Sequence, residues 1–163
     1  MHWVRSAFAI GATLVAACGM YASGGPLSPM TLDGALTDAQ RLAARHEGGQ
    51  VMRVEGASML PFFGDNSVLV TKPVSPERLR PGMVVVYRNR FGEIVAHRIE
   101  AHSEGGWIVR GYSNPADDST LVCAENLLGV VYATFYSNGR VSDGGDLAAV
   151  WAQTPVALAA PAR

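Results

Sequence analysis

The chain has 163 residues, a formal net charge of −1 and a sequence pI of about 6.4. This length supports a single domain, and the near-neutral charge leaves no basic surface of the kind that nucleic-acid phosphates require, so nucleic-acid binding is excluded. Eighteen glycines and nine prolines among short apolar runs favour a β-rich fold over a helical bundle.

Residues 1–22 form a membrane anchor or signal segment. Arg5 and the α-amino group precede an uncharged apolar run at residues 7–22, which is slightly shorter than the roughly 17–25 residues that a membrane span needs. A positive flank before such a run predicts a cytoplasmic N-terminus, with the rest of the chain across the membrane. Three interpretations stay open: a single uncleaved span, a lipoprotein and a cleaved secretory signal. The lipoprotein would carry its lipid on Cys18, because residues 15–18 (Val-Ala-Ala-Cys) resemble a bacterial lipobox.

A linker and a short helix are predicted next. Residues 23–36 are the linker, which begins rich in glycine, proline and serine. Residues 37–40 (Thr-Asp-Ala-Gln) have the form of a capping box, which predicts a helix from Thr37 to about His46. The two glycines at 48–49 then end this helix.

Six short segments rich in valine, isoleucine and aromatic residues follow, with glycine, proline or asparagine turns between them. The predicted strands are residues 50–55, 67–71, 83–88, 94–101, 107–110 and 127–135. We therefore expect a mostly β fold, a coiled antiparallel sheet system with a short N-terminal helix. The globular domain would span residues 37–140, and residues 141–163 would be a tail of unknown role.

Ser58 is the first candidate functional residue. Residues 54–61 read Val-Glu-Gly-Ala-Ser-Met-Leu-Pro, so the serine follows a predicted strand and precedes a bend. That arrangement exposes the hydroxyl and turns backbone N–H groups toward it, and a nucleophile needs both features. Taken alone, the pattern is equally typical of a serine that caps a turn.

His97 is the best candidate for a general base. Alternation along the predicted strand places it on the apolar face with Val95 and Ile99. A histidine on such a face is usually a core residue. The other histidines are worse placed, however, because His102 falls on the opposite face and His46 lies at the predicted helix.

A polar loop at residues 110–118 supplies the third group. A serine–histidine pair needs a partner that holds the imidazole tautomer and stabilises the imidazolium. The loop ends in two carboxylates, Asp117 and Asp118. Such a loop is otherwise a solvated turn, and the pattern by itself does not choose between the two aspartates.

In this order, these segments resemble the signal peptidase I superfamily of serine peptidases. The resemblance covers about residues 51–133. Its motifs are Val-x-Gly-x-Ser-Met-x-Pro at 54–61, Gly-Asp-x-x-x-Leu-Val at 64–70, Leu-x-Pro-Gly-x-Val-Val-Val-Tyr-Arg at 79–88, His-Arg-Ile at 97–99, Gly-x-x-Asn-x-x-Asp-Asp at 111–118 and Leu-Gly-Val-Val at 128–131. Histidine at position 97, where most bacterial members have lysine, is similar to the Ser-His-Asp branch of archaeal and endoplasmic-reticulum enzymes.

The resemblance implies a membrane-tethered serine endopeptidase that processes signal peptides, that is, one that cleaves exported polypeptides through an acyl-enzyme. It implies a domain on the extracytoplasmic face and neither a metal nor a cofactor. In that family's scheme Ser58 is the nucleophile and its backbone N–H the oxyanion donor, His97 is the base, and Asp118 orients His97. An extended substrate would lie beside residues 54–57, with contacts from three residues: Val54, Gly56 and Met59.

Three positions depart from the family's pattern, and one of them, Met83 in place of an aspartate, is interpreted as structural. Gly56 stands where many signal peptidases have a serine whose hydroxyl assists the oxyanion hole, and Tyr112 replaces the aspartate of Gly-Asp-x-Asn. They keep an alternative open, a catalytically inactive, envelope-anchored β binding module on the same scaffold.

Overall fold

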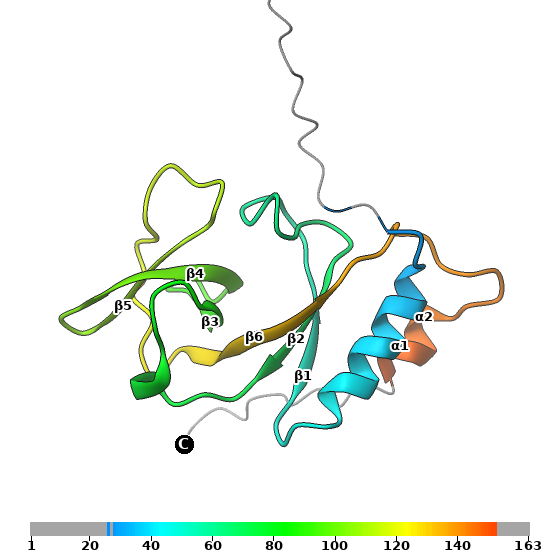
Figure 1. Ribbon diagram of the computed structural model, residues 1–163, viewed down its shortest axis with the longest axis horizontal. Helices are drawn as coiled ribbons and strands as arrows, with labels where there is room; N and C mark the ends of the chain where they lie inside the picture. Colours follow the sequence, from blue (N-terminus) through cyan, green and yellow to red (C-terminus); the bar gives the residue numbers. More distant parts are fainter. Residues whose placement is uncertain (1–25, 27, 153–163) are drawn as a thin grey trace, which may run out of the picture.

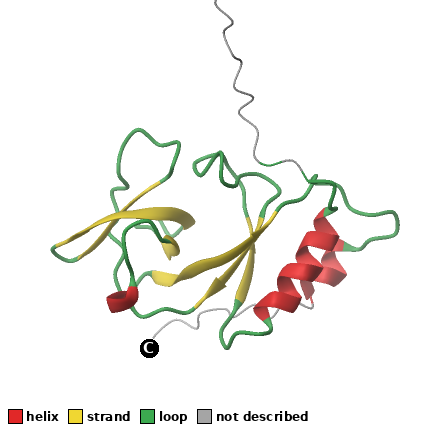
Figure 2. Cartoon of the chain, viewed as in Figure 1, coloured by secondary structure: helices red, strands yellow, loops and turns green. Residues whose placement is uncertain are grey.

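A computed structural model describes residue 26 and residues 28–152. This part of the chain is mostly β, with one six-stranded antiparallel sheet and a helix packed at one end of it (Figures 1 and 2). The elements in chain order are α1 (Leu32–Ala43), β1 (Gln50–Arg53), β2 (Val68–Lys72), the 3-10 turn η1 (Pro76–Arg78), β3 (Val84–Arg88), β4 (Ile94–Ser103), β5 (Gly106–Arg110), β6 (Leu127–Phe135) and α2 (Leu147–Ala152).

The sheet has the strand order β1-β2-β6-β3-β4-β5, and every neighbouring pair is antiparallel. Its register shifts at three places, in β2, β3 and β4. Such irregularities increase the local twist and bend the strands. The two halves of the sheet consequently turn toward each other (Figure 1), and the end of β1 and the start of β4 line one cleft although they are far apart in the strand order.

All six predicted strands are present, with ends that differ from the prediction by two residues at most. The strand prediction is therefore confirmed. It succeeded because each strand is either an alternation of apolar and polar residues or an apolar run, bounded by strong turn residues. The resulting sheet confirms the mostly β class with a short N-terminal helix.

The helix prediction was wrong about the start. The helix α1 begins at Leu32, after Thr31, and Thr37 lies in its middle, where its hydroxyl donates to the carbonyl oxygen of Asp33 at 2.8 Å. A threonine can satisfy its hydroxyl this way inside a helix as well as at a cap. Residues 32–36, predicted as linker, are therefore the first turn of the helix. The buried face of α1 has helical spacing and comprises Leu32, Ala35, Leu36, Ala39 and Ala43.

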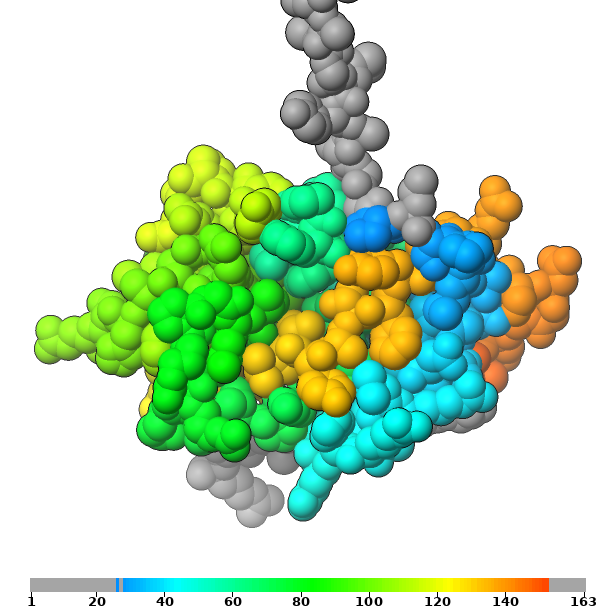
Figure 3. Space-filling model, in the orientation of Figure 1, coloured from blue at the N-terminus to red at the C-terminus, as the bar shows by residue number. Residues whose placement is uncertain are grey.

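Three apolar clusters hold the fold together. The first lies between α1 and strands β1 and β2, and the second lies among β3, β4 and β5. The third is small and supports the segment that carries Ser58, with Met59, Phe63 and Leu69 buried at its centre. In the space-filling view the segment after β6 lies beside this part of the chain (Figure 3), and the Tyr136 hydroxyl donates to the carbonyl oxygen of Phe62 at 2.9 Å.

Part of the predicted tail joins the fold. Leu147, Val150 and Trp151 of α2 pack on the first cluster. Hydrogen bonds from the hydroxyl and the backbone N–H of Ser142 to Asp33 lower the pKa of that carboxyl group to about 2. The predicted anchor or signal segment, with Cys18, lies outside the described residues. Within the part of the chain that the structure describes, no helix has the length and apolar character to cross a membrane.

Candidate active site

Ser58 lies in a loop that is fixed at both sides. Just after β1, the Val54 N–H donates to the carbonyl oxygen of Ser67 at 2.9 Å. The chain then turns at Gly56, whose φ of +103° is a conformation that favours glycine, and the Gly56 N–H donates to Asp65 Oδ1 at 2.7 Å. These contacts, together with the buried Met59, fix the position of the serine.

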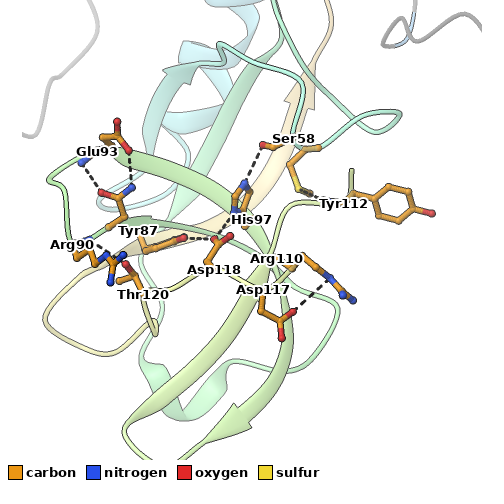
Figure 4. Close-up of polar contacts among 12 residues, drawn as sticks. Ser58, Tyr87, Arg90, Glu93, His97, Arg110, Tyr112, Asp117, Asp118 and Thr120 are labelled. Carbon is orange, nitrogen blue, oxygen red and sulfur yellow. Dashed lines mark hydrogen bonds and ion pairs between the residues drawn. The ribbon is translucent and has the colours of Figure 1, made fainter. Parts of the chain in front are cut away.

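His97 lies within hydrogen-bond reach of that serine. It is on β4, opposite Val85 of β3, and is 6% exposed. Its Nε2 is 3.0 Å from Ser58 Oγ, and its Nδ1 contacts Asp118 Oδ2 (Figure 4). Because an ionised carboxylate only accepts, Nδ1 carries the proton and Nε2 is free to accept from the serine hydroxyl. This is the tautomer that a general base at Nε2 requires.

Asp118 reaches the histidine from the loop that follows β5. Its backbone N–H donates to the carbonyl oxygen of Val109 at 2.9 Å, and its side chain is 15% exposed. The neighbouring Asp117 points elsewhere: its side chain is 50% exposed, and its Oδ1 lies 3.6 Å from Arg110 Nε. The structure thus brings Ser58, His97 and Asp118 together and leaves Asp117 outside the group (Figure 4).

Tyr87 is a member of this group that the sequence reasoning missed. Its hydroxyl donates to Asp118 Oδ2, the oxygen that His97 also contacts. Burial, followed by the hydrogen bond to Asp118 and that residue's charge, raises the pKa of Tyr87 far above its ordinary value, so the side chain remains a neutral donor. Alternation alone could not have indicated it, because the register of β3 against β4, which pairs Tyr87 with Val95, two residues from His97, puts both side chains on one face.

The loop of Asp118 docks directly on the loop of Ser58. The Ser113 N–H donates to the Ser58 carbonyl oxygen at 2.8 Å, and the Ser113 hydroxyl donates to that of Leu60 at 2.9 Å. The Tyr112 N–H contacts Met59 Sδ at 3.4 Å, which also keeps the two loops together. The side chain of Tyr112 points away from the serine (Figure 4).

The backbone N–H of Ser58 is a free donor beside the serine hydroxyl. Among residues 26 and 28–152, the N–H of Ser58 has no hydrogen-bond acceptor. The N–H of Gly56, in contrast, is occupied by Asp65. A free N–H next to a nucleophile is the kind of group that stabilises an oxyanion.

A cleft of about 250 Å³ opens next to Ser58. One wall is the end of β1 and the residues after it, 52–56, and the other wall is the start of β4, residues 94–96. Apolar side chains form much of the remaining lining of the cleft. All three residues expected to contact a substrate, Val54, Gly56 and Met59, line this cleft.

The remaining described histidines lie elsewhere: His46 packs edge-on against Tyr132, and His102 against Trp107. In the described part of the chain, no three His, Cys, Asp or Glu side chains are grouped as metal ligands.

The sequence matches no protein-family model and no curated protein. The geometry of the site is therefore the basis for assigning a function.

Proposed function

We propose that this chain is a serine endopeptidase of the signal peptidase I type, with Ser58 as nucleophile, His97 as general base and Asp118 as the group that orients the imidazole. The observation that carries the proposal is the continuous contact from Ser58 Oγ to His97 Nε2 at 3.0 Å and from His97 Nδ1 to Asp118. A serine, a histidine and a carboxylate in this order are the arrangement that activates a hydroxyl for acyl transfer.

The proposed reaction follows from these positions. Ser58 Oγ attacks the substrate carbonyl carbon while its proton passes to His97 Nε2, and the Ser58 N–H stabilises the oxyanion. The protonated Nε2 then gives that proton to the leaving amine, which frees one product and leaves an ester on Ser58. A water molecule, deprotonated by Nε2, hydrolyses the ester and restores the serine hydroxyl.

The family resemblance gains support from the places of its motifs in the fold. The motifs at 54–61, 97–99 and 111–118 are distant in sequence and meet at one site. Gly56 supplies no hydroxyl and its N–H is occupied, so the oxyanion hole of this chain would depend on Ser58. One such donor accounts for about 10²–10³ in rate, and we therefore expect slower turnover than in relatives with a serine there.

The cleft suits an extended polypeptide. Strand β5 pairs with β4 only from Arg98 onward, so within the described chain residues 94–97 have no strand on that side. The Asn89 N–H donates to the Glu93 carbonyl oxygen, and alternation from there directs the backbone groups of Ile94 and Ala96 away from β3. A peptide could pair with this edge and pass Val54 and Gly56 to reach Ser58.

Membrane attachment and an exported substrate are further parts of the proposal. They rest on the positive flank at Arg5 ahead of the apolar run, a pattern that favours an extracytoplasmic position for the domain. A phosphatase fused after Arg163 should be active in cells. An inactive, cytoplasmic fusion would contradict both the topology and the proposed exported substrate.

A fluorophosphonate probe tests the activity itself, because it phosphonylates, with loss of fluoride, only a serine whose base and oxyanion hole function together. We expect labelling of the full-length chain and none of Ser58→Ala. Ser75→Ala is the matched control, because Ser75 is exposed, precedes η1 and makes no side-chain capping bond. Absence of labelling in the wild type, with the fold intact, would instead support the inactive binding module.

A further inference from the structure

We infer that Tyr87 is a positioning residue of this site, which acts through Asp118 by holding its carboxylate against His97. The inference rests on the proposed function. Its basis is that two donors from neighbouring strands, the Tyr87 hydroxyl on β3 and His97 Nδ1 on β4, meet at one oxygen of Asp118 (Figure 4).

Tyr87 is held more firmly than the residue it contacts. The side chain is 1% exposed and packs in the cluster among β3, β4 and β5, and the backbone pairs with strands on both sides. Asp118, in contrast, lies in a loop and keeps some contact with solvent. A hydroxyl on a rigid strand therefore fixes a carboxylate that the loop alone would leave free to rotate.

No other side chain replaces this donor. In the described part of the chain, the Asp118 carboxylate receives side-chain hydrogen bonds from His97 and Tyr87 alone. Arg110, a cationic residue at the end of β5, contacts Glu100 and Asp117 instead. The Tyr87 hydroxyl thus has two effects: it orients the Asp118 carboxylate, and its hydrogen bond stabilises the negative charge of that carboxylate.

Tyr87→Phe removes the hydroxyl and keeps the ring that fills the core. We expect kcat to fall about tenfold, the lower end of what a hydrogen bond to a charged group is worth, with KM little changed. The acid limb of the rate profile should move to higher pH, because the unshared charge on Asp118 holds a proton on the imidazole more firmly.

Two comparisons separate positioning from a general loss of structure. Tyr132→Phe removes a hydroxyl from an exposed tyrosine on β6 and should change neither kcat nor the pH profile. In an Asp118→Ala background, Tyr87→Phe should have almost no further effect, because its target is gone. An equal loss of kcat in both backgrounds would show that the Tyr87 hydroxyl supports the fold and does not act through Asp118.

Histidine-labelled NMR measures the contact without turnover. The proton on His97 Nδ1 should give a strongly downfield resonance, and Tyr87→Phe should shift this resonance while Tyr132→Phe leaves it in place. If Tyr87→Phe shifts this resonance but the wild type is not phosphonylated by the fluorophosphonate, the contact stands and the proposed function fails. If the wild type is phosphonylated and Tyr87→Phe alters neither the resonance nor the pH profile, the inference is overturned.

Discussion

Replacing Gly111 with alanine adds one methyl group at the tightest point of the site. An ideal Cβ at this position lies 2.9 Å from His97 Nε2 and 2.7 Å from Asn114 Nδ2. The optimal separation of such heavy atoms is about 3.5 Å or more, so the overlap on the imidazole is at least about half an ångström. Asn114 is only half-buried and its amide can move, whereas His97 is fastened at Nδ1 to Asp118.

The imidazole must therefore tilt, and the 3.0 Å contact between Nε2 and Ser58 Oγ opens toward the limit at which a hydrogen bond is lost. A misplacement of about 1 Å at a reacting group costs on the order of 10²-fold, so we expect Gly111→Ala to slow the reaction by roughly 10- to 100-fold. Substrate binding should change little, because Gly111 does not line the cleft.

The measurement is the rate at which a fluorophosphonate phosphonylates Ser58, followed by peptide hydrolysis for kcat and KM. Gly34→Ala in α1 is the control, because it adds the same methyl group far from the site, where the nearest atom, Thr31 Oγ1, is 3.2 Å away. Thermal unfolding checks that both variants are folded. Phosphonylation of Gly111→Ala at the wild-type rate would refute the claim that this loop fixes the position of His97.

Three further predictions concern the same group of residues. Ser58→Ala and His97→Ala should each abolish turnover, and the double variant should be no slower than either, as for residues that act as one unit; additive losses measured by kcat would argue against a shared mechanism. Asp118→Asn should reduce kcat by about 10⁴, whereas Asp117→Asn should cost less than about tenfold, because its ion pair with Arg110 is exposed; equal losses would mean that the wrong carboxylate is assigned. Because the pKa of Tyr87 is raised in the folded protein, the contribution of Tyr87 to the free energy of unfolding should be constant below about pH 10 and then fall by up to about 1.4 kcal/mol per pH unit as unfolded Tyr87 ionises. Urea titrations at pH 9–11 should show that Tyr87→Phe loses this part of the slope, and an unchanged slope would contradict the buried, bonded hydroxyl.

The sequence predicted the strands well and the helix start poorly, for a physical reason. The strands are bounded by strong turn residues, and their apolar pattern has one period that can be read locally. The start of α1 depends on packing instead, because Leu32, Ala35 and Leu36 enter a core formed with β1 and β2. The polar residues at 37–40 imitate a cap, and no local feature reveals that the buried face begins a turn and a half earlier.

The sequence by itself determined the mostly β class, the order of the motifs and the three residues Ser58, His97 and Asp118 as candidates. Only the tertiary structure decided how they meet. The contact of Asp118 with His97, the docking of the 111–118 loop on the Ser58 loop and the hydroxyl of Tyr87 on the carboxylate all depend on strand register and on the bending of the sheet. These are contacts between residues 21 to 53 positions apart, and a pattern read along the chain reports which face a side chain takes but not which distant side chain that face will meet.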